Sequence, residues 1–166
     1  MKKNLYKTSK KKGLGCYDYR TSWTIYPQIL NMTTIKEGEK VLDAGCGDGE
    51  FSRYLKNVEL YGSDFSEKAV KRAREKGYKK VLKNDITKLG FKNKEFDKTF
   101  SIQVFQYVTD PHNAFRELLR VTKKQVIITV PNFRWLKTRA RLSKEYRKNY
   151  EFCLKHENYT DTQFLK

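Results

Sequence analysis

The sequence predicts an α/β protein with a Rossmann-like, doubly wound sheet of parallel strands. Short apolar runs alternate with amphipathic segments through the middle of the chain, the pattern of strands joined by helical crossovers. The first run ends in an acidic residue and a glycine-rich turn, within Val41–Glu50. Two further acids, Asp64 and Asp85, follow the next two runs. Strand, acid, glycine turn and helix in this order are typical of an α/β protein that binds a nucleotide-type ligand.

Five strands are expected from these runs. They lie at Lys40–Ala44, Val58–Gly62, Lys79–Lys83, Glu95–Ser101 and Gln125–Val130. The last run is rich in β-branched residues and has no polar alternation, which is typical of a strand buried on both faces. Pro131 ends it, and Ile86–Leu89 predicts a short turn between the third and fourth strands.

Helices are expected between and before the strands. Tyr17–Leu30 predicts a helix that is broken at Pro27 and packs over the domain, and Phe51–Asn57 predicts another. Ser66 has the character of an N-cap for a helix that Gly77 stops. Asp110 caps the next helix, with Pro111 at its first position. The expected apolar stripe of that helix is Ala114, Phe115, Leu118, Leu119 and Val121.

A chain of 166 residues is expected to form one domain. We divide it into a basic arm with an N-terminal helical cap (1–39), a Rossmann-like core (40–131) and a basic helical C-terminal segment (132–166). No run of 18 apolar residues predicts a membrane span, and the N-terminus lacks the apolar region of a secretory signal. Cys16, Cys46 and Cys153 form no Cys-x-x-Cys pair, so neither a disulfide framework nor a zinc site is expected, and a cytoplasmic location fits.

The formal net charge of +17 has two interpretations. A polyanionic partner such as RNA would be attracted through its phosphates. A solvated, lysine-rich surface explains the same composition, since bulk charge bears first on solubility and non-specific binding. The basic excess is spread along the chain, densest at its two ends, and both interpretations stay open.

The acids Asp43, Asp64 and Asp85 end or follow successive strands, so all three are expected at the carboxyl edge of the sheet. A carboxylate after the second strand can accept hydrogen bonds from the vicinal hydroxyls of a ribose, and one after the third from an exocyclic amine such as that of adenine. Each acid taken alone can equally be a helix cap or a loop aspartate. The three together favour a ligand site.

The turn at Gly45, Gly47 and Gly49 has the spacing Gly-x-Gly-x-Gly. A dinucleotide site prefers Gly-x-Gly-x-x-Gly, and no Gly-x-x-x-x-Gly-Lys-Ser/Thr of a triphosphate-binding P-loop is present. A turn without lysine and surrounded by acids suits a ligand that lacks phosphates or carries a positive charge.

These segments resemble class I S-adenosylmethionine-dependent methyltransferases, in the small-molecule branch called methyltransferase type 11. Asp43–Gly49 resembles motif I, Gly62–Ser66 the acidic end of the second strand, and Asn84–Ile86 the segment that contacts adenine. Phe96–Asp97 and Val108–Val121 resemble the fourth strand and the helix after it. The resemblance covers about residues 40–131. It implies S-adenosylmethionine as cofactor, bound by Asp43, Gly45, Cys46, Gly47, Gly49, Asp64, Phe65, Asn84, Asp85, Ile86 and Gln103.

In that arrangement Asp43 and the turn hold the methionine part, Asp64 the ribose and Asp85 the adenine, while Gln103–Tyr107 line the junction with the acceptor. Phe65 lies against the adenine ring or is a core residue. Cys46 is expected to be a small residue packed against the fourth strand, a nucleophilic role being the alternative. No general base is assigned: His112 is expected on the surface, and His156 and Tyr107 are candidates.

Val130–Trp135 and Arg139–Leu142 resemble the MetW-like family, which is associated with methionine biosynthesis. The superfamily's sheet normally ends in an antiparallel hairpin after the fifth strand. Only about 35 residues follow Pro131, so the hairpin is expected to be missing or truncated.

Three functions are compatible with the sequence. The first is a methyltransferase acting on a small molecule, which the fourth-strand region favours. The second is an RNA or protein methyltransferase, which the positive charge favours. The third is a non-catalytic subunit that works through a protein partner.

Overall fold

The computed structural model describes residues 19–130, which form a five-stranded parallel sheet with helices on both faces. The strands are β1 (Lys40–Ala44), β2 (Glu59–Asp64), β3 (Lys80–Lys83), β4 (Phe96–Ile102) and β5 (Thr122–Thr129). Their order across the sheet is β3-β2-β1-β4-β5, with every neighbouring pair parallel. The predicted fold class is confirmed, and each strand lies within a few residues of its expected place.

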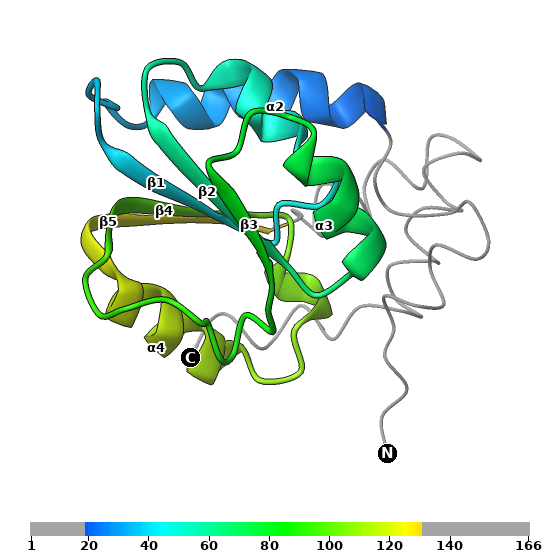
Figure 1. Ribbon diagram of the computed structural model, residues 1–166, viewed down its shortest axis with the longest axis vertical. Helices are drawn as coiled ribbons and strands as arrows, with labels where there is room; N and C mark the ends of the chain where they lie inside the picture. The colour runs from blue at the N-terminus through cyan, green and yellow to red at the C-terminus, as the bar shows by residue number, and fades with distance from the viewer. Residues whose placement is uncertain (1–18, 131–166) are drawn as a thin grey trace, which may run out of the picture.

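The helices lie on opposite faces of this sheet, as Figure 1 shows. On one face are α2 (Tyr19–Asn31) and α3 (Glu67–Arg74), and on the other is α4 (Pro111–Val121). Two short 3₁₀ helices, η2 (Glu50–Tyr54) and η3 (Phe105–Tyr107), follow the carboxyl ends of β1 and β4. The strand order reverses between β1 and β4. Folds of this kind bind ligands in the crevice at such a switch point, beyond the carboxyl ends of the strands.

Each face of the sheet has its own apolar cluster, because successive side chains of a strand point to opposite faces. In β1, Val41 belongs to the cluster beneath α2 and α3, whereas Leu42 and Ala44 belong to the cluster above α4. The first cluster is centred on Phe51 and Phe100, whose ring centroids are 5.0 Å apart. Both faces of the central strand are thus sealed from water, as the continuous apolar sequence of β1 indicates.

The prediction that the first helix breaks at Pro27 is wrong, since α2 runs through it to Asn31. Pro27 is exposed, while its neighbour Tyr26 and Ile29, one turn of helix away on the same side, are buried against the core. The backbone carbonyl that a helical proline deprives of its partner can therefore be hydrated on the outer side of α2. Packing of the inner side keeps the helix continuous.

The predicted helix at Phe51–Asn57 is also corrected, since η2 is a single 3₁₀ segment of five residues. Gly49 precedes it with φ 80°, and no side chain caps its first turn. Leu55 ends it in an extended conformation, so the chain turns early toward β2.

Two predictions of burial hold only in part in the second half of the fold. The apolar run of β5 packs against the clusters on both faces, Ile127 against one and Val126 and Ile128 against the other, but only Ile127 is buried and Gln125 is exposed. In α4, Ala114, Leu118 and Val121 are buried as expected, whereas Phe115 and Leu119 are each 45% exposed. The apolar stripe of α4 is therefore narrower than its sequence indicates. The helix itself begins as predicted, with Asp110 accepting a hydrogen bond from the Asn113 backbone N–H and Pro111 at its first position.

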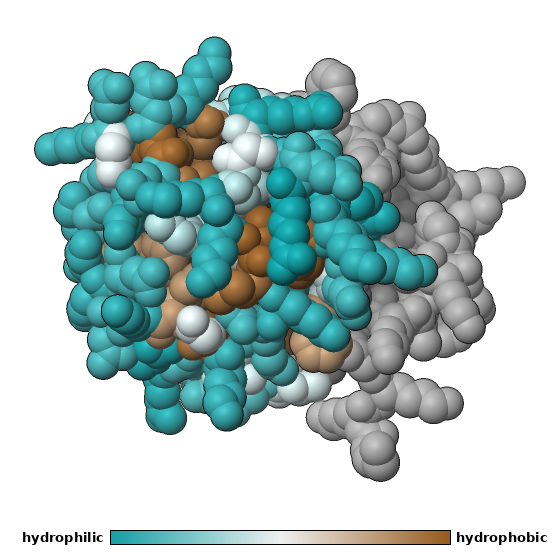
Figure 2. All heavy atoms as spheres, viewed as in Figure 1, coloured by the Kyte–Doolittle hydropathy of each residue, from teal (hydrophilic) through white to brown (hydrophobic). Residues whose placement is uncertain are grey.

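Ion pairs connect β4 and β5 to the segment before β1 near the amino ends of the strands. Lys98, 7% exposed, lies 3.8 Å from the carboxylate of Glu39 and donates a hydrogen bond to the Thr34 carbonyl. Lys124 pairs with Glu39 and Asp97, both at 3.0 Å. These contacts tie the segment after α2 to β4 and β5 at the edge opposite the crevice. Elsewhere the described surface is mainly hydrophilic on the side that Figure 2 shows.

The core assignment predicts contrasting effects for two phenylalanines. Phe100 is fully buried, so Phe100→Ala is expected to lower the free energy of unfolding by about 3–5 kcal/mol. Phe115→Ala, at a half-exposed position, is expected to lower it by less than about 1 kcal/mol. Urea denaturation followed by circular dichroism measures both, and equal losses would contradict the assignment.

Candidate functional site

The loop after β1 is closed by backbone hydrogen bonds to the end of β2. The N–H groups of Gly45 and Cys46 both donate to the Ser63 carbonyl, at 2.7 and 2.9 Å. The N–H of Gly49 donates to the Cys46 carbonyl at 2.9 Å. We call residues 45–49 the glycine loop. It lies at the carboxyl edge of the sheet, where the sequence places it.

Asp64 joins this loop to the start of α3. Its Oδ2 accepts a hydrogen bond from the Gly47 N–H at 2.9 Å, and its Oδ1 accepts one from the Ser66 N–H at 2.8 Å. Ser66 in turn caps α3, its side chain accepting from the Ala69 N–H, as predicted. Asp64 is 7% exposed, so its two oxygens are held by the backbone in a fixed orientation.

Asp43 lies beneath the loop, 3% exposed, and bonds to a residue that the sequence analysis did not single out. Its Oδ2 accepts a hydrogen bond of 2.7 Å from the Tyr78 hydroxyl, although the two residues are 35 positions apart. The pKa of Asp43 is raised to about 7: burial raises it most, the hydrogen bond from Tyr78 lowers it, and the nearby charge of Asp64 raises it. A buried tyrosine hydroxyl usually has a partner, but nothing in the sequence says which.

Glycine is required at several positions here because other side chains occupy the space of the missing Cβ. A Cβ on Gly45 would overlap the Val104 side chain, and φ at Gly45 is +86°. Gly47 differs: its φ is +53°, yet no atom lies within 4 Å of the place of its Cβ. The missing side chain of Gly45 therefore makes room for Val104, whereas that of Gly47 leaves room beside the loop for a ligand.

Cys46 is a buried thiol rather than a nucleophile. It is 8% exposed and belongs to the cluster beneath α2 and α3, and burial raises its pKa well above the usual range. Its Sγ lies next to Gly62 of β2, where a Cβ would be 3.1 Å away. The predicted packing role thus holds, and the neighbour that the structure shows for the thiol is β2.

The third acid lies on an exposed turn after β3. Asp85 accepts hydrogen bonds from the Thr87 N–H at 2.9 Å and from the Thr87 hydroxyl at 2.7 Å, the pattern of an aspartate that stabilises its own turn. The preceding Asn84 donates its N–H to the Asp64 carbonyl at 3.1 Å, and Ile86 is half-buried. The segment 84–86 therefore lies beside the end of β2, within the same edge of the sheet as the glycine loop.

Of the remaining residues that the sequence analysis named, Phe65 and Gln103 directly follow β2 and β4. Phe65 is 46% exposed and thus not a core residue. Gln103 follows β4 with φ 57°, unusual for a residue other than glycine, and its N–H donates to the Thr129 carbonyl at 3.1 Å. His112 is exposed, as expected. His156 and the segment Pro131–Leu142 lie outside residues 19–130.

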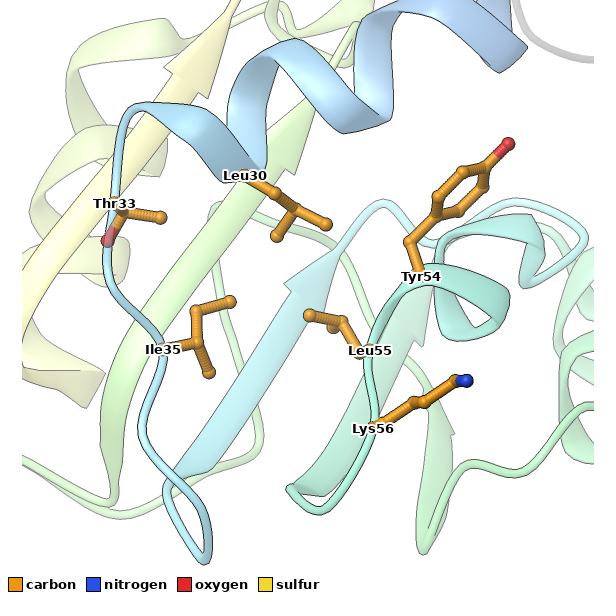
Figure 3. A pocket seen from close by; sticks show the side chains of 6 residues that line it. All are labelled: Leu30, Thr33, Ile35, Tyr54, Leu55 and Lys56. Atoms are coloured by element: carbon orange, nitrogen blue, oxygen red, sulfur yellow. The ribbon is translucent and has the colours of Figure 1, made fainter.

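A separate hollow lies between α2 and the segment after η2. It has a volume of about 220 Å³. Figure 3 shows the side chains that line it, namely Leu30, Thr33, Ile35, Tyr54, Leu55 and Lys56. None of them belongs to the predicted site.

Among residues 19–130, no cluster of three His, Cys, Asp or Glu side chains suits a metal ion. No helix in that range has the length and apolarity to cross a membrane.

The site thus offers two acids fixed near a loop with open space at Gly47, an exposed aromatic ring and an exposed polar turn. Buried carboxylates attract a cationic ligand, because the interaction is screened less than in water. Of the loop residues 45–49, none is a lysine or arginine that would bind a phosphate.

Comparison with known proteins gives a consistent result. A family model described as a methyltransferase domain matches residues 35–164. An uncharacterised protein of Methanocaldococcus jannaschii is 40% identical over 100 residues, which cover 59% of this chain and 39% of that protein. The malonyl-[acyl-carrier protein] O-methyltransferase of Pectobacterium atrosepticum is 32% identical over 122 residues, covering 69% of this chain and 47% of that enzyme. The chain thus spans less than half the length of these curated relatives.

A solved structure of similar fold is a Thermotoga maritima SAM-dependent methyltransferase described as a possible histamine N-methyltransferase. It has a TM-score of 0.65 and 26% identity, covering 86% of this chain and 66% of that one.

The contact between Gly45 and Val104 predicts a steric cost that is specific to one glycine. Gly45→Ala combines a clash with a left-handed backbone and is expected to lower the free energy of unfolding by about 2–5 kcal/mol. Gly47→Ala incurs only the backbone strain, about 1–2 kcal/mol. Adding Val104→Ala to Gly45→Ala is expected to restore part of the loss in urea denaturation. An unchanged loss in that double variant would be inconsistent with the contact.

Proposed function

The chain belongs to the methyltransferase domain family, and we propose that it transfers the methyl group of S-adenosylmethionine to a small-molecule acceptor. The chain shares the fold of the class I methyltransferases, and S-adenosylmethionine is the cofactor of those enzymes. The observation that carries the proposal is the carboxylate of Asp64, fixed between the glycine loop and the start of α3.

In the proposed complex Asp64 holds the ribose. Each of its oxygens already accepts one backbone N–H, and a carboxylate oxygen has a second lone pair for a ribose hydroxyl. The backbone bonds set the direction of those lone pairs before any ligand arrives. Pre-organisation of this kind lowers the entropic cost of binding.

The adenine lies between Phe65 and the turn after β3. Phe65 exposes nearly half of its surface directly after Asp64, which suits an aromatic ring that stacks on a base. Asp85, Asn84 and Ile86 supply a polar and apolar edge there. Asp85 retains its role in the turn, because both of its bonds to Thr87 use the same oxygen, Oδ1.

The methionine part lies beside the glycine loop, with Gly47 providing the open approach. Asp43 and Asp64 place negative charge beneath and beside this loop, where it favours the ammonium and sulfonium groups of the cofactor. The donor set fits a cationic ligand without phosphates. The described residues therefore fit S-adenosylmethionine.

The cofactor when bound supplies a methyl group on a positively charged sulfur, which is already electrophilic. The protein holds that group in line with the acceptor and keeps water away. Gln103–Tyr107, directly after β4, lie where the acceptor approaches. No base is required when the acceptor nucleophile is already deprotonated, and His112 is exposed on α4.

A small-molecule acceptor is favoured by the branch of the family that β4 and α4 resemble. The Pectobacterium relative, by its name, methylates a malonyl group on a carrier protein. RNA is the second candidate, favoured by the net charge of +17. A tRNA (carboxymethyluridine(34)-5-O)-methyltransferase of Arabidopsis thaliana is 31% identical over 116 residues, covering 66% of this chain and 28% of that enzyme.

Cofactor binding is expected to depend on the carboxylate of Asp64 and not on that of Asp97, which lies at the opposite edge of the sheet. Asp64→Asn is expected to weaken binding of S-adenosylmethionine at least about tenfold in isothermal titration calorimetry, because one charged acceptor of the ribose is lost. Asp97→Asn is the matched control, since Asp97 also accepts a backbone N–H, from Lys40, but at the amino end of β4. Similar losses in both variants would count against the ribose assignment.

The class of acceptor is tested by transfer of a tritiated methyl group from S-adenosylmethionine into fractions of a cell extract. Label is expected in the fraction of low molecular mass and not in purified RNA. Label that is retained with RNA and released by ribonuclease would instead support the second candidate, and binding would then weaken steeply with salt.

A further inference from the structure

Tyr78 lies between the glycine loop and β2, and it contacts Asp43. It follows Gly77, lies two residues before the start of β3, and is 8% exposed. Its hydroxyl donates to Oδ2 of Asp43 at 2.7 Å, with both groups buried. No residue role proposed above includes it.

The ring of Tyr78 also fits against two glycines. A Cβ on Gly49 would lie 3.0 Å from Cε2 of Tyr78, and a Cβ on Gly62 would lie 3.0 Å from Cδ1. Gly49 belongs to the glycine loop and Gly62 to β2, so the ring fills the space between the loop and the strand. Ala73 of α3 closes the same space, its Cα 3.0 Å from a Cβ on Gly49.

Asp43 is the group near Tyr78 that changes charge near neutral pH. Its pKa is raised to about 7, by burial first and by Asp64 of β2, whereas the bond from Tyr78 lowers it. The other groups that face the pair are the Cys46 thiol, whose pKa burial raises, and the Tyr26 ring of α2. Burial raises the pKa of Tyr78 as well, so its hydroxyl keeps its proton and remains a donor.

We propose that Tyr78 is a positioning residue of the cofactor site, holding the Asp43 carboxylate in place beneath the glycine loop with its hydroxyl and supporting the loop with its ring. This inference rests on the proposed function, because a fixed anion beneath the loop serves a cationic ligand. A hydrogen bond to the ionised carboxylate favours that form over the protonated one. Loss of the hydroxyl therefore leaves Asp43 neutral at a pH where the cofactor needs its charge.

The test is the pH dependence of S-adenosylmethionine binding by the Tyr78→Phe variant, measured by titration calorimetry between about pH 6 and pH 8.5. Phenylalanine keeps the ring against Gly49 and Gly62 and removes only the hydroxyl. Affinity is expected to fall about tenfold near pH 6 and about fivefold near pH 7, with the loss shrinking toward pH 8.5 as Asp43 ionises in both proteins. The midpoint of the pH profile thus moves upward by about one unit.

Tyr61→Phe is the matched control. Tyr61 is also largely buried, on β2, but its hydroxyl bonds to Glu59 at 3.4 Å, near the amino end of the strand. Loss of the Tyr61 hydroxyl is expected to leave the pH profile of S-adenosylmethionine binding unchanged. A Tyr78→Phe variant whose affinity falls equally at every pH would overturn the proposal, because a purely structural role would produce that result.

Asp43→Asn identifies the titrating group. In that background, adding Tyr78→Phe is expected to cause no further pH-dependent loss, and a persisting shift would show that another group is responsible. If the unaltered chain binds no S-adenosylmethionine, the proposed function fails together with this inference. If it binds and Tyr78→Phe keeps the same midpoint, the inference alone fails.

Should Tyr78→Phe not fold, the double variant with Asp43→Asn removes the buried carboxylate that has lost its partner. Recovery of cooperative unfolding in the double variant would support the role of Tyr78 in holding Asp43. Failure to recover would overturn it, since the defect would then come from packing alone.

Discussion

The parallel register of β1 with β2 is the constraint on which the site depends. Asp43 pairs with Gly62 and Ala44 with Ser63, so the two strands end side by side. The loop after β1 can then bond to the Ser63 carbonyl, and Asp64 can reach back to Gly47. A shift of this register by one residue would turn every side chain of the strand to the other face, and the acids would no longer converge.

Close packing of neighbouring side chains accounts for most of the glycines in the loop after β1 and in β2. Gly45 leaves room for Val104 after β4, while Gly49 and Gly62 leave room for the ring of Tyr78. The loop is thereby packed against residues of two segments that are distant in the chain, one after β4 and one before β3. Within the glycine loop, Gly47 alone has open space at its Cβ position, and that is the side on which a ligand can lie. Gly45, Gly49 and Gly62 thus allow close packing, whereas Gly47 gives a ligand access to the loop.

Charge is distributed unequally between the two edges of the sheet. At the amino edge, Glu39 and Asp97 have lysine partners, Lys98 and Lys124 among them. Those pairings, together with backbone hydrogen bonds, lower the pKa of both acids. At the carboxyl edge, burial first and then the charge of Asp64 raise the pKa of Asp43, although the hydrogen bond from Tyr78 lowers it. Carboxylates are thus stabilised as anions at the amino edge, whereas Asp43 at the ligand-binding edge is kept close to neutrality.

The sequence by itself determined the parallel α/β fold, the place of the glycine loop and the convergence of Asp43, Asp64 and Asp85 at one edge of the sheet. These follow from local patterns: strand periodicity, the N-caps Ser66 and Asp110, and the rule that parallel strands end at the same edge. The family resemblance added the identity of the cofactor.

Only the tertiary structure decided what the local patterns leave open. The continuity of α2 through Pro27, the partial burial of β5 and the exposure of Phe115 depend on what packs against each segment. The partner of Asp43 is a tyrosine 35 residues away, and the neighbour of Gly45 is a valine beyond β4. Contacts between residues so distant in the chain have no local signal, because they arise when separate strands and helices meet.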